Sequence, residues 1–148
     1  MKRPSIAIAL FATVIAACGG SEPAKKTDTT QKMSSGDDSH ALCMSFFQRQ
    51  RECTDVYIPA LVAARVEADK PAGIAQEDQA NGRDALVAKA NEEWAQDSTD
   101  EAIGAMCDKI MTSEPAQADI EQGRSCMAEQ TCEAFVPCAI DLTKRHWQ

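Results

Sequence analysis

Seven cysteines are the residues of this 148-residue chain whose type and spacing could do chemistry. Cysteine thiolates bind zinc, attach haem, exchange electrons in redox sites or join in disulfides. Structural zinc sites bring together cysteines separated by roughly two to four residues, or paired histidines. The closest cysteines here, such as Cys126 and Cys132, have five residues between them, and no Cys-x-x-Cys sequence is present. The spacing therefore favours disulfides, and we expect neither a metal nor a cofactor.

Acid-base and nucleophilic catalysis find no better support in the sequence. The two histidines are His40, in a polar segment, and His146, near the end of the sequence, where we expect a solvated side chain. No serine lies in a nucleophile-elbow motif, and Gly19-Gly20 belongs to the polar segment rather than to a phosphate-binding loop. We therefore name no catalytic residue and expect that the protein is not an enzyme.

Two acidic stretches could attract a cation or a basic partner. Residues 77–82 are superficially similar to a calcium loop, but the twelfth position from Glu77 is Ala88, which cannot supply the required carboxylate. The second group surrounds an expected helix junction, where carboxylates stabilise the N-terminus of the following helix. We expect a solvated surface there, with a cation or basic-partner site as the alternative. This group comprises Glu92, Glu93, Asp97, Asp100 and Glu101.

The N-terminal segment has the pattern of an export signal. Residues 1–17 carry only two charges, Lys2 and Arg3, followed by an apolar run from Ile6 to Ala17. A helix of this run would be about 18 Å long, well short of the roughly 30 Å hydrocarbon core of a bilayer. No later segment of the sequence is apolar over a membrane-spanning length. We therefore expect an exported protein without a transmembrane helix.

The residues that end this run, Ile15-Ala16-Ala17-Cys18 followed by Gly19-Gly20-Ser21, resemble the lipobox of bacterial lipoproteins. The resemblance covers residues 1–20 only. It implies a signal peptide over residues 1–17, cleavage before Cys18, a diacylglyceryl group on that cysteine and usually a third acyl chain, such as palmitate, on the new amino terminus. An ordinary secretory signal is the alternative, but Ile15 is large for the third position before its cleavage site. Setting Cys18 aside leaves six cysteines, an even number suited to disulfides.

The lipid would hold the protein on a membrane. One acyl chain binds only marginally, whereas two or more anchor a protein stably, at about 0.8 kcal/mol per buried methylene. In the lipoprotein family, Asp after the lipidated cysteine favours the inner membrane, and here that residue is Gly19. The resemblance therefore implies the outer membrane rather than the inner one, with the periplasmic and surface faces both open.

A change of composition divides the remaining chain in two. Residues 18–40 are polar, with Met33 as their only large apolar side chain, and predict a disordered tether with a span of roughly 25 Å. Residues 41–148 form the expected domain, with 10 basic and 19 acidic side chains and hence a net charge of −9. Such a charge argues against nucleic acid as a partner. It also predicts repulsion from an anionic membrane, which leaves lipid contact to the anchor.

The domain is expected to be all-α, a small disulfide-stapled bundle of five or six short helices, because its sequence lacks strand-type alternation and repeats. A helix beginning near Ser39 would carry an apolar stripe from Cys43 to Ala64, with a kink or a new helix at Pro59. Further helices are expected over residues 83–96, after a capping box of Ser98 and Glu101, and after Pro115. The sequence Lys70-Pro71-Ala72-Gly73 should end the first unit, and Thr131 and Pro137 should divide the last stretch.

Three disulfides should supplement a modest apolar core, and they use Cys43, Cys53, Cys107, Cys126, Cys132 and Cys138. The ten-residue separation of Cys43 and Cys53 is close to the twelve-residue separation of Cys126 and Cys138. An antiparallel helical hairpin would match these separations. We therefore expect Cys43 to pair with Cys138, Cys53 with Cys126 or Cys132, and Cys107 with whichever of the two remains.

Together these features predict a lipid-anchored acidic module of the cell envelope, with a non-enzymatic interaction or structural role and an envelope protein as its partner. A ligand-binding lipoprotein with a pocket between its helices is the alternative, and an enzyme is a third possibility. Convergent polar groups in a pocket would favour the alternative, whereas a shallow exposed apolar patch would favour the first hypothesis. We expect the larger aromatic side chains to pack mainly in the core, although they could also line a groove: Phe46, Phe47, Tyr57, Trp94, Phe135 and Trp147.

Overall fold

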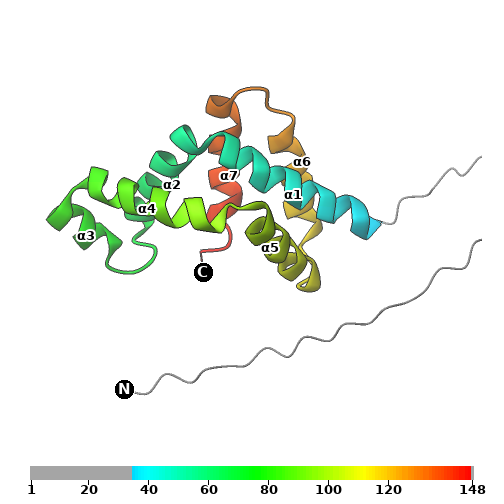
Figure 1. Ribbon diagram of the computed structural model, residues 1–148, viewed down its shortest axis with the longest axis horizontal. Coiled ribbons are helices and arrows are strands. Elements are labelled where there is room, and N and C mark those ends of the chain that lie inside the picture. Colours follow the sequence, from blue (N-terminus) through cyan, green and yellow to red (C-terminus); the bar gives the residue numbers. More distant parts are fainter. Residues whose placement is uncertain (1–34, 148) are drawn as a thin grey trace, which may run out of the picture. The chain divides into compact units, whose positions relative to one another are not determined.

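A computed structural model describes residues 35–147, which form seven helices and no strand (Figure 1). The all-α class is therefore confirmed for this part of the chain. The lipobox and Cys18 lie outside the described residues. The helices, in chain order, are α1 (Ser35–Glu52), α2 (Thr54–Ala68), α3 (Ile74–Asn81), α4 (Arg83–Asp97), α5 (Asp100–Thr112), α6 (Gln117–Met127) and α7 (Cys132–Lys144).

The first helix starts earlier than the sequence indicates. α1 begins at Ser35, so the last six residues of the tether expected over residues 18–40 belong to the folded domain. Two side chains there contact distant helices: Asp38 accepts from Arg124 of α6 at 2.6 Å, and His40 lies 3.0 Å from Asp108 of α5. These long-range contacts explain why a polar segment without a core-forming pattern is ordered.

The chain breaks at Cys53 rather than at Pro59, which corrects the expected position of the kink. Cys53 has φ −98° and ψ 18°, and it separates α1 from α2. At this break the hydroxyl of Thr54 donates to the carbonyl of Arg51 at 2.6 Å. Pro59 lies inside α2 with an exposed side chain, where water can solvate the carbonyl that its missing N–H leaves free.

The turn after α2 uses a carboxylate to begin the next helix. Asp69 takes the left-handed conformation, and its side chain accepts hydrogen bonds from the N–H groups of Gly73 and Ala75 at 2.9 and 3.2 Å. Gly73, with φ 94°, precedes α3, a helix that periodicity did not predict because none of its side chains is fully buried. The first unit ends at residues 69–73, as expected.

Two threonines begin later helices. The side chain of Thr99 accepts from the N–H of Ala102 at 3.2 Å, so the N-cap of α5 lies one residue after the expected Ser98. Thr131 caps α7 in the same way, through the N–H of Ala134 at 3.3 Å. Pro137 lies within α7 and does not divide it, contrary to expectation.

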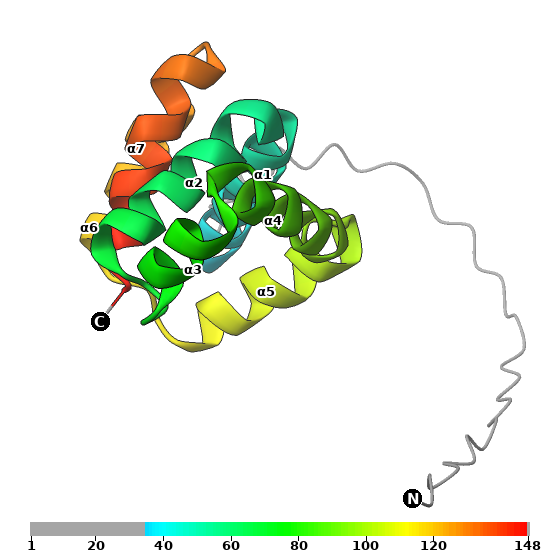
Figure 2. The same ribbon diagram turned by 90° about the vertical axis from the view of Figure 1, so that its left-hand side faces the viewer.

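The core is built around α2 and α7. Side chains that are almost fully buried there include Tyr57, Ile58, Val62, Phe135 and Ile140. α2 also packs against α4, whereas α1 packs against α5 and α6 (Figures 1 and 2). Ile103 and Cys107 of α5 are completely buried on the α1 side of the domain. Among the described helices, none combines the length and apolar character needed to cross a bilayer.

Candidate functional site

All six cysteines of the domain are paired in disulfides. Cys43 of α1 joins Cys107 of α5, with their Cα atoms 5.8 Å apart. Cys53 joins Cys132 at 5.4 Å, which confirms one of the two partners expected for Cys53. Cys126 joins Cys138 at 5.5 Å. The sequence therefore identified the disulfide cysteines correctly, and Cys18 is the one cysteine of the chain outside these pairs.

The expected pairing of Cys43 with Cys138, and of Cys107 with Cys126 or Cys132, is wrong. It assumed that residues 126–138 form one helical arm, but the chain turns back between α6 and α7, which brings Cys126 beside Cys138. The partner of Cys43 is on α5 because the apolar face of that helix, which contains Cys107, is buried against α1.

The disulfides divide the domain into cross-linked and unlinked parts. In the chain-entropy model, the disulfides that close loops of 64 and 79 residues each raise the free energy of unfolding by about 4 kcal/mol. The disulfide that closes the 12-residue loop raises it by about 3 kcal/mol. No cysteine lies on α3 or α4, so noncovalent contacts rather than disulfides hold this helical hairpin in place. Leu86 is its only fully buried side chain.

The acidic group at the α4–α5 junction is exposed, as expected. One member, Asp100, lies 2.7 Å from Arg51, which also donates to the carbonyl of Ser98 at 2.8 Å. These contacts fasten α1 to the start of α5. The remaining members, Glu92, Glu93, Asp97 and Glu101, have no ion-pair partner among the described residues.

Residues 77–82 belong to α3 and its C-terminal turn, and their carboxylates form ion pairs with basic side chains of α4. Asp78 accepts two hydrogen bonds of 2.8 Å from Arg83, and this pair lowers the pKa of the Asp78 carboxyl and raises that of Arg83. Glu77 lies 3.6 Å from Lys89 of α4. Across the described residues, no three histidine, cysteine or acidic side chains are grouped to hold a metal ion.

Each histidine is paired with a carboxylate on another helix. His40, expected in the tether, lies on α1 beside Asp108. His146 is exposed, as expected, and its Nε2 is 3.3 Å from Asp119 of α6. Asp119 also contacts Arg145 at 3.3 Å, so one carboxylate fastens two residues that follow α7.

The larger aromatic side chains pack mainly in the core, as expected. Phe46 lies 5.4 Å from Phe135, and Tyr57 lies 5.5 Å from Trp94, measured between ring centroids. The Trp94 Nε1–H donates to the hydroxyl of Thr54 at 3.0 Å. Burial raises the pKa of Tyr57, while a hydrogen bond with Thr143 and the nearby Arg65 charge act in the opposite direction.

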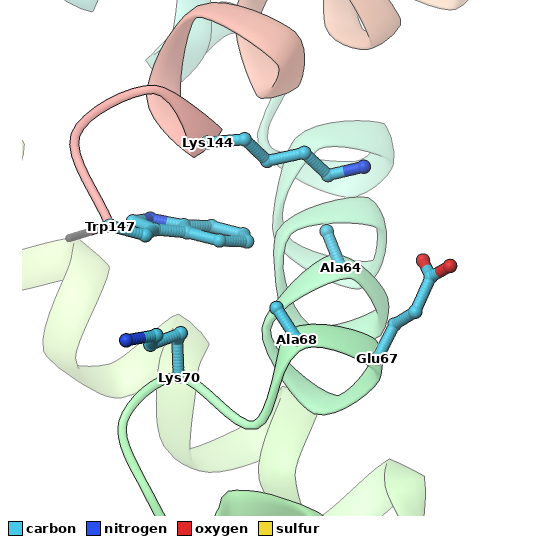
Figure 3. A pocket seen from close by; sticks show the side chains of 6 residues that line it. All are labelled: Ala64, Glu67, Ala68, Lys70, Lys144 and Trp147. Carbon is cyan, nitrogen blue, oxygen red and sulfur yellow. The ribbon is translucent and has the colours of Figure 1, made fainter.

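Trp147 differs from these aromatic residues because it borders a shallow, open surface cavity of about 450 Å³ at the C-terminal end of α2. Figure 3 shows its indole between Lys144 and Lys70, with one edge directed toward Ala64 and Ala68. Glu67 completes the lining. In Figure 3 the Lys144 ammonium lies on the same side as Glu67, whereas the Lys70 ammonium points the other way. The aromatic ring and small apolar side chains, with an ammonium group on either side, could accept anions that carry an apolar group.

A second cavity, of about 340 Å³, lies between α2, α3 and α4. Its apolar lining includes Val62, Ile74 and Leu86. Two positive and two negative side chains also line it, namely Arg65, Lys89, Glu77 and Glu93. Convergent charges of this kind are the feature that favours the ligand-binding alternative.

Two of the unpaired positive charges of the domain lie beside the first cavity. Ten lysines and arginines lie in residues 35–147, and six of them form ion pairs with a carboxylate. The other four, for which the described residues provide no such partner, are Arg65, Lys70, Lys109 and Lys144. Two of these, Lys70 and Lys144, line the Trp147 cavity, whereas Arg65 lines the second cavity.

Sequence reasoning did not find this cavity. Lys70 and Lys144 are 74 residues apart, and only the packing of α7 against α2 brings them to the same indole. The available signal was the sequence from Lys144 to Trp147, in which three basic side chains precede an aromatic one.

Comparisons with protein-family models, curated proteins and solved structures find no match for this chain.

Proposed function

We propose that this protein is a lipid-anchored interaction module of the bacterial cell envelope, held at the outer membrane through Cys18 and not an enzyme. The observation that carries the proposal is the cysteine distribution: six of the seven cysteines form disulfides, and the seventh ends a lipobox-like sequence. Disulfides persist in oxidising, exported compartments. A free thiol at Cys18 would be an anomaly there, whereas a lipidated cysteine would not.

The surface of the domain supports binding to another envelope protein. At the α4–α5 junction lie four exposed carboxylates for which the described part of the chain provides no ion-pair partner. A complementary basic surface on a partner would gain association rate and orientation from this charge. The disulfides would keep the surface in a fixed shape and so reduce the entropy lost on binding.

Acyl labelling of producing cells, followed by membrane fractionation, tests the anchor. We expect label on the wild-type protein, recovery with the outer membrane, and loss of both in a Cys18→Ala variant. Ser21→Ala is the matched control, because it changes a neighbouring residue outside the lipidated position. Label that persists in Cys18→Ala, or a wild-type protein wholly in the soluble fraction, would contradict the proposal.

Cross-linking in intact cells tests the interaction role. The protein should be recovered with one recurrent envelope protein, and charge reversal of Glu92 and Glu93 to lysine should lower that recovery. Glu129→Lys, an exposed acidic residue after α6, is the control. Equal recovery with all three proteins would show that the α4–α5 junction does not bind the partner.

The cavity between α2, α3 and α4 favours ligand binding as a second candidate function, because charges of both signs converge over its apolar lining. Mass spectrometry of small molecules that copurify with the intact protein would test it. A ligand that is lost when Arg65 and Lys89 are both changed to Gln would support this second function over protein binding.

A further inference from the structure

The cavity around Trp147 combines features of a membrane-contacting site. Its walls are an indole ring, two alanines of α2 and the side chains of Lys70 and Lys144 (Figure 3). Trp147 is half-buried, while both lysines are exposed. Tryptophan is enriched at membrane interfaces, and lysine extends its ammonium group to the headgroup region while its methylenes cover apolar surface.

Among the described residues, no carboxylate lies within ion-pair distance of Lys70 or Lys144. The Asp69 carboxylate is occupied by the N–H groups of Gly73 and Ala75, and Asp119 contacts Arg145 and His146. The remaining carboxylate is that of Glu67, which lines the cavity but is directed away from the indole (Figure 3).

The net charge of the domain does not prevent contact at this end. Electrostatic interactions between exposed charges decay over about 8 to 10 Å in physiological salt. An anionic surface therefore interacts mainly with the charges of the end that faces it, and each lysine near such a surface contributes about 1 kcal/mol. The Trp147 end presents two unpaired lysines, whereas the α4–α5 junction presents unpaired carboxylates.

We propose that the Trp147 cavity and its two lysines bind the phosphate headgroups of anionic phospholipids and so dock this end of the domain on the membrane. The ammonium groups of Lys70 and Lys144 extend in opposite directions from the cavity (Figure 3), and each donates hydrogen bonds to phosphate oxygens of the headgroups on its own side. The indole of Trp147 lies at the boundary between headgroups and acyl chains. Docking leaves the acidic α4–α5 junction accessible to a partner. This inference rests on the proposed anchor at Cys18, which keeps the domain close to the lipid surface.

The test uses the mature lipidated protein reconstituted into vesicles that contain a lipid brominated near the glycerol backbone. Bromine quenches nearby tryptophan, and a Trp147→Phe variant identifies the part of the quenching that belongs to Trp147. We expect Trp147 to be quenched in phosphatidylglycerol vesicles and much less in phosphatidylcholine vesicles. Equal quenching in the two, or no quenching in either, would overturn docking to an anionic headgroup.

Charge variants make the test specific to the cavity. Lys70→Gln and Lys144→Gln should each weaken docking about fivefold, as expected for the loss of one lysine near an anionic surface. Glu67→Gln should strengthen it. Lys109→Gln is the matched control, because Lys109 is exposed on α5, is also unpaired among the described residues, and does not line the cavity. If Lys109→Gln weakened docking as much as Lys144→Gln, the cavity would not be the binding site.

Two further measurements separate this inference from other possibilities. Vesicle flotation tests the anchor alone: a protein that floats without Trp147 quenching contradicts docking, whereas one that does not float contradicts the anchor. Inorganic phosphate added to protein on phosphatidylcholine vesicles tests for a soluble ligand. A Trp147 emission change with free phosphate, without a response to phosphatidylglycerol, would overturn the lipid headgroup as the ligand.

Discussion

Gln50 is a polar residue in an apolar place. Its side chain is only 1% exposed, and its Oε1 finds no hydrogen-bond partner within residues 35–147. An unsatisfied buried polar atom costs roughly 1 to 3 kcal/mol, because it loses hydration without compensation. Gln50 therefore lowers the stability of the domain at a position where the sequence predicted part of an apolar stripe.

Gln50→Leu should raise the free energy of unfolding by about 1 kcal/mol, since it removes the unpaired oxygen and keeps a similar volume. Chemical denaturation of the oxidised protein measures the change. Gln48→Leu, on the same helix but only half-buried, should have little effect. A clear loss of stability in Gln50→Leu would show that its carbonyl oxygen has a stabilising partner after all.

Tyr57 is the only tyrosine of the chain, so its titration can be followed alone by tyrosinate absorbance. Burial raises its pKa above the usual value of 10.0. The contribution of neutral Tyr57 to stability should therefore be complete below pH 10 and decline as the pH rises toward the folded-state pKa, because the unfolded chain releases the proton first. Tyr57→Phe should remove this part of the alkaline loss of stability. A wild-type absorbance midpoint at or below 10.0 would contradict the assigned burial.

At the scale of the helices, features set by neighbouring residues were predicted from the sequence, whereas features set by long-range packing were not. The helix expected over residues 83–96 is almost the observed α4, and Thr131 does begin α7, because these features depend on nearby residues. The break at Cys53 and the order of residues 35–40 could not be predicted, because both depend on contacts with distant helices. The expected partners of Cys43 and Cys107 were wrong for the same reason, whereas Cys132 was one of the two partners expected for Cys53.

The N-cap of α5 offers a direct test of a one-residue difference between sequence and structure. Thr99→Ala should lower the free energy of unfolding by about 1 kcal/mol, because its hydroxyl accepts the N–H of Ala102. Glu101→Gln should cost less, since the expected capping box with Ser98 is not formed. Thermal denaturation of both variants measures the difference. A larger loss of stability in Glu101→Gln than in Thr99→Ala would show that the capping box of Ser98 and Glu101 is formed after all.

The hairpin of α3 and α4 should be the first part of the domain to open. It has no disulfide and one fully buried side chain, Leu86, whereas the other five helices contain or directly border cross-linked cysteines. Native-state hydrogen exchange should therefore give lower opening free energies for residues 74–97 than for α2 and α7. Leu86→Ala should lower them further, and Ala88→Gly, at an exposed site of α4, should have the smaller effect. Equal protection throughout would mean that packing fastens α4 as firmly as the disulfides fasten the rest.

At the scale of the whole molecule, covalent cross-links and charge define what the domain can do. The acidic composition and the disulfide cysteines were evident from the sequence, whereas the Trp147 cavity depends on helices that are distant in the chain. The three disulfides fix α1, α5, α6 and α7 relative to one another, so the domain keeps its shape in an oxidising compartment. The proposed anchor would then hold a rigid, acidic domain at the membrane.

Non-reducing peptide mapping of the protein isolated from its native cells is the most direct test of the proposed anchor and the disulfides, because one experiment reports on all seven cysteines. We predict an N-terminal peptide that begins at Cys18 and carries acyl chains, together with three linked peptides that contain Cys43–Cys107, Cys53–Cys132 and Cys126–Cys138. An unmodified Cys18, or a disulfide between Cys18 and any cysteine of the domain, would contradict the central claim of a lipid-anchored, internally cross-linked module.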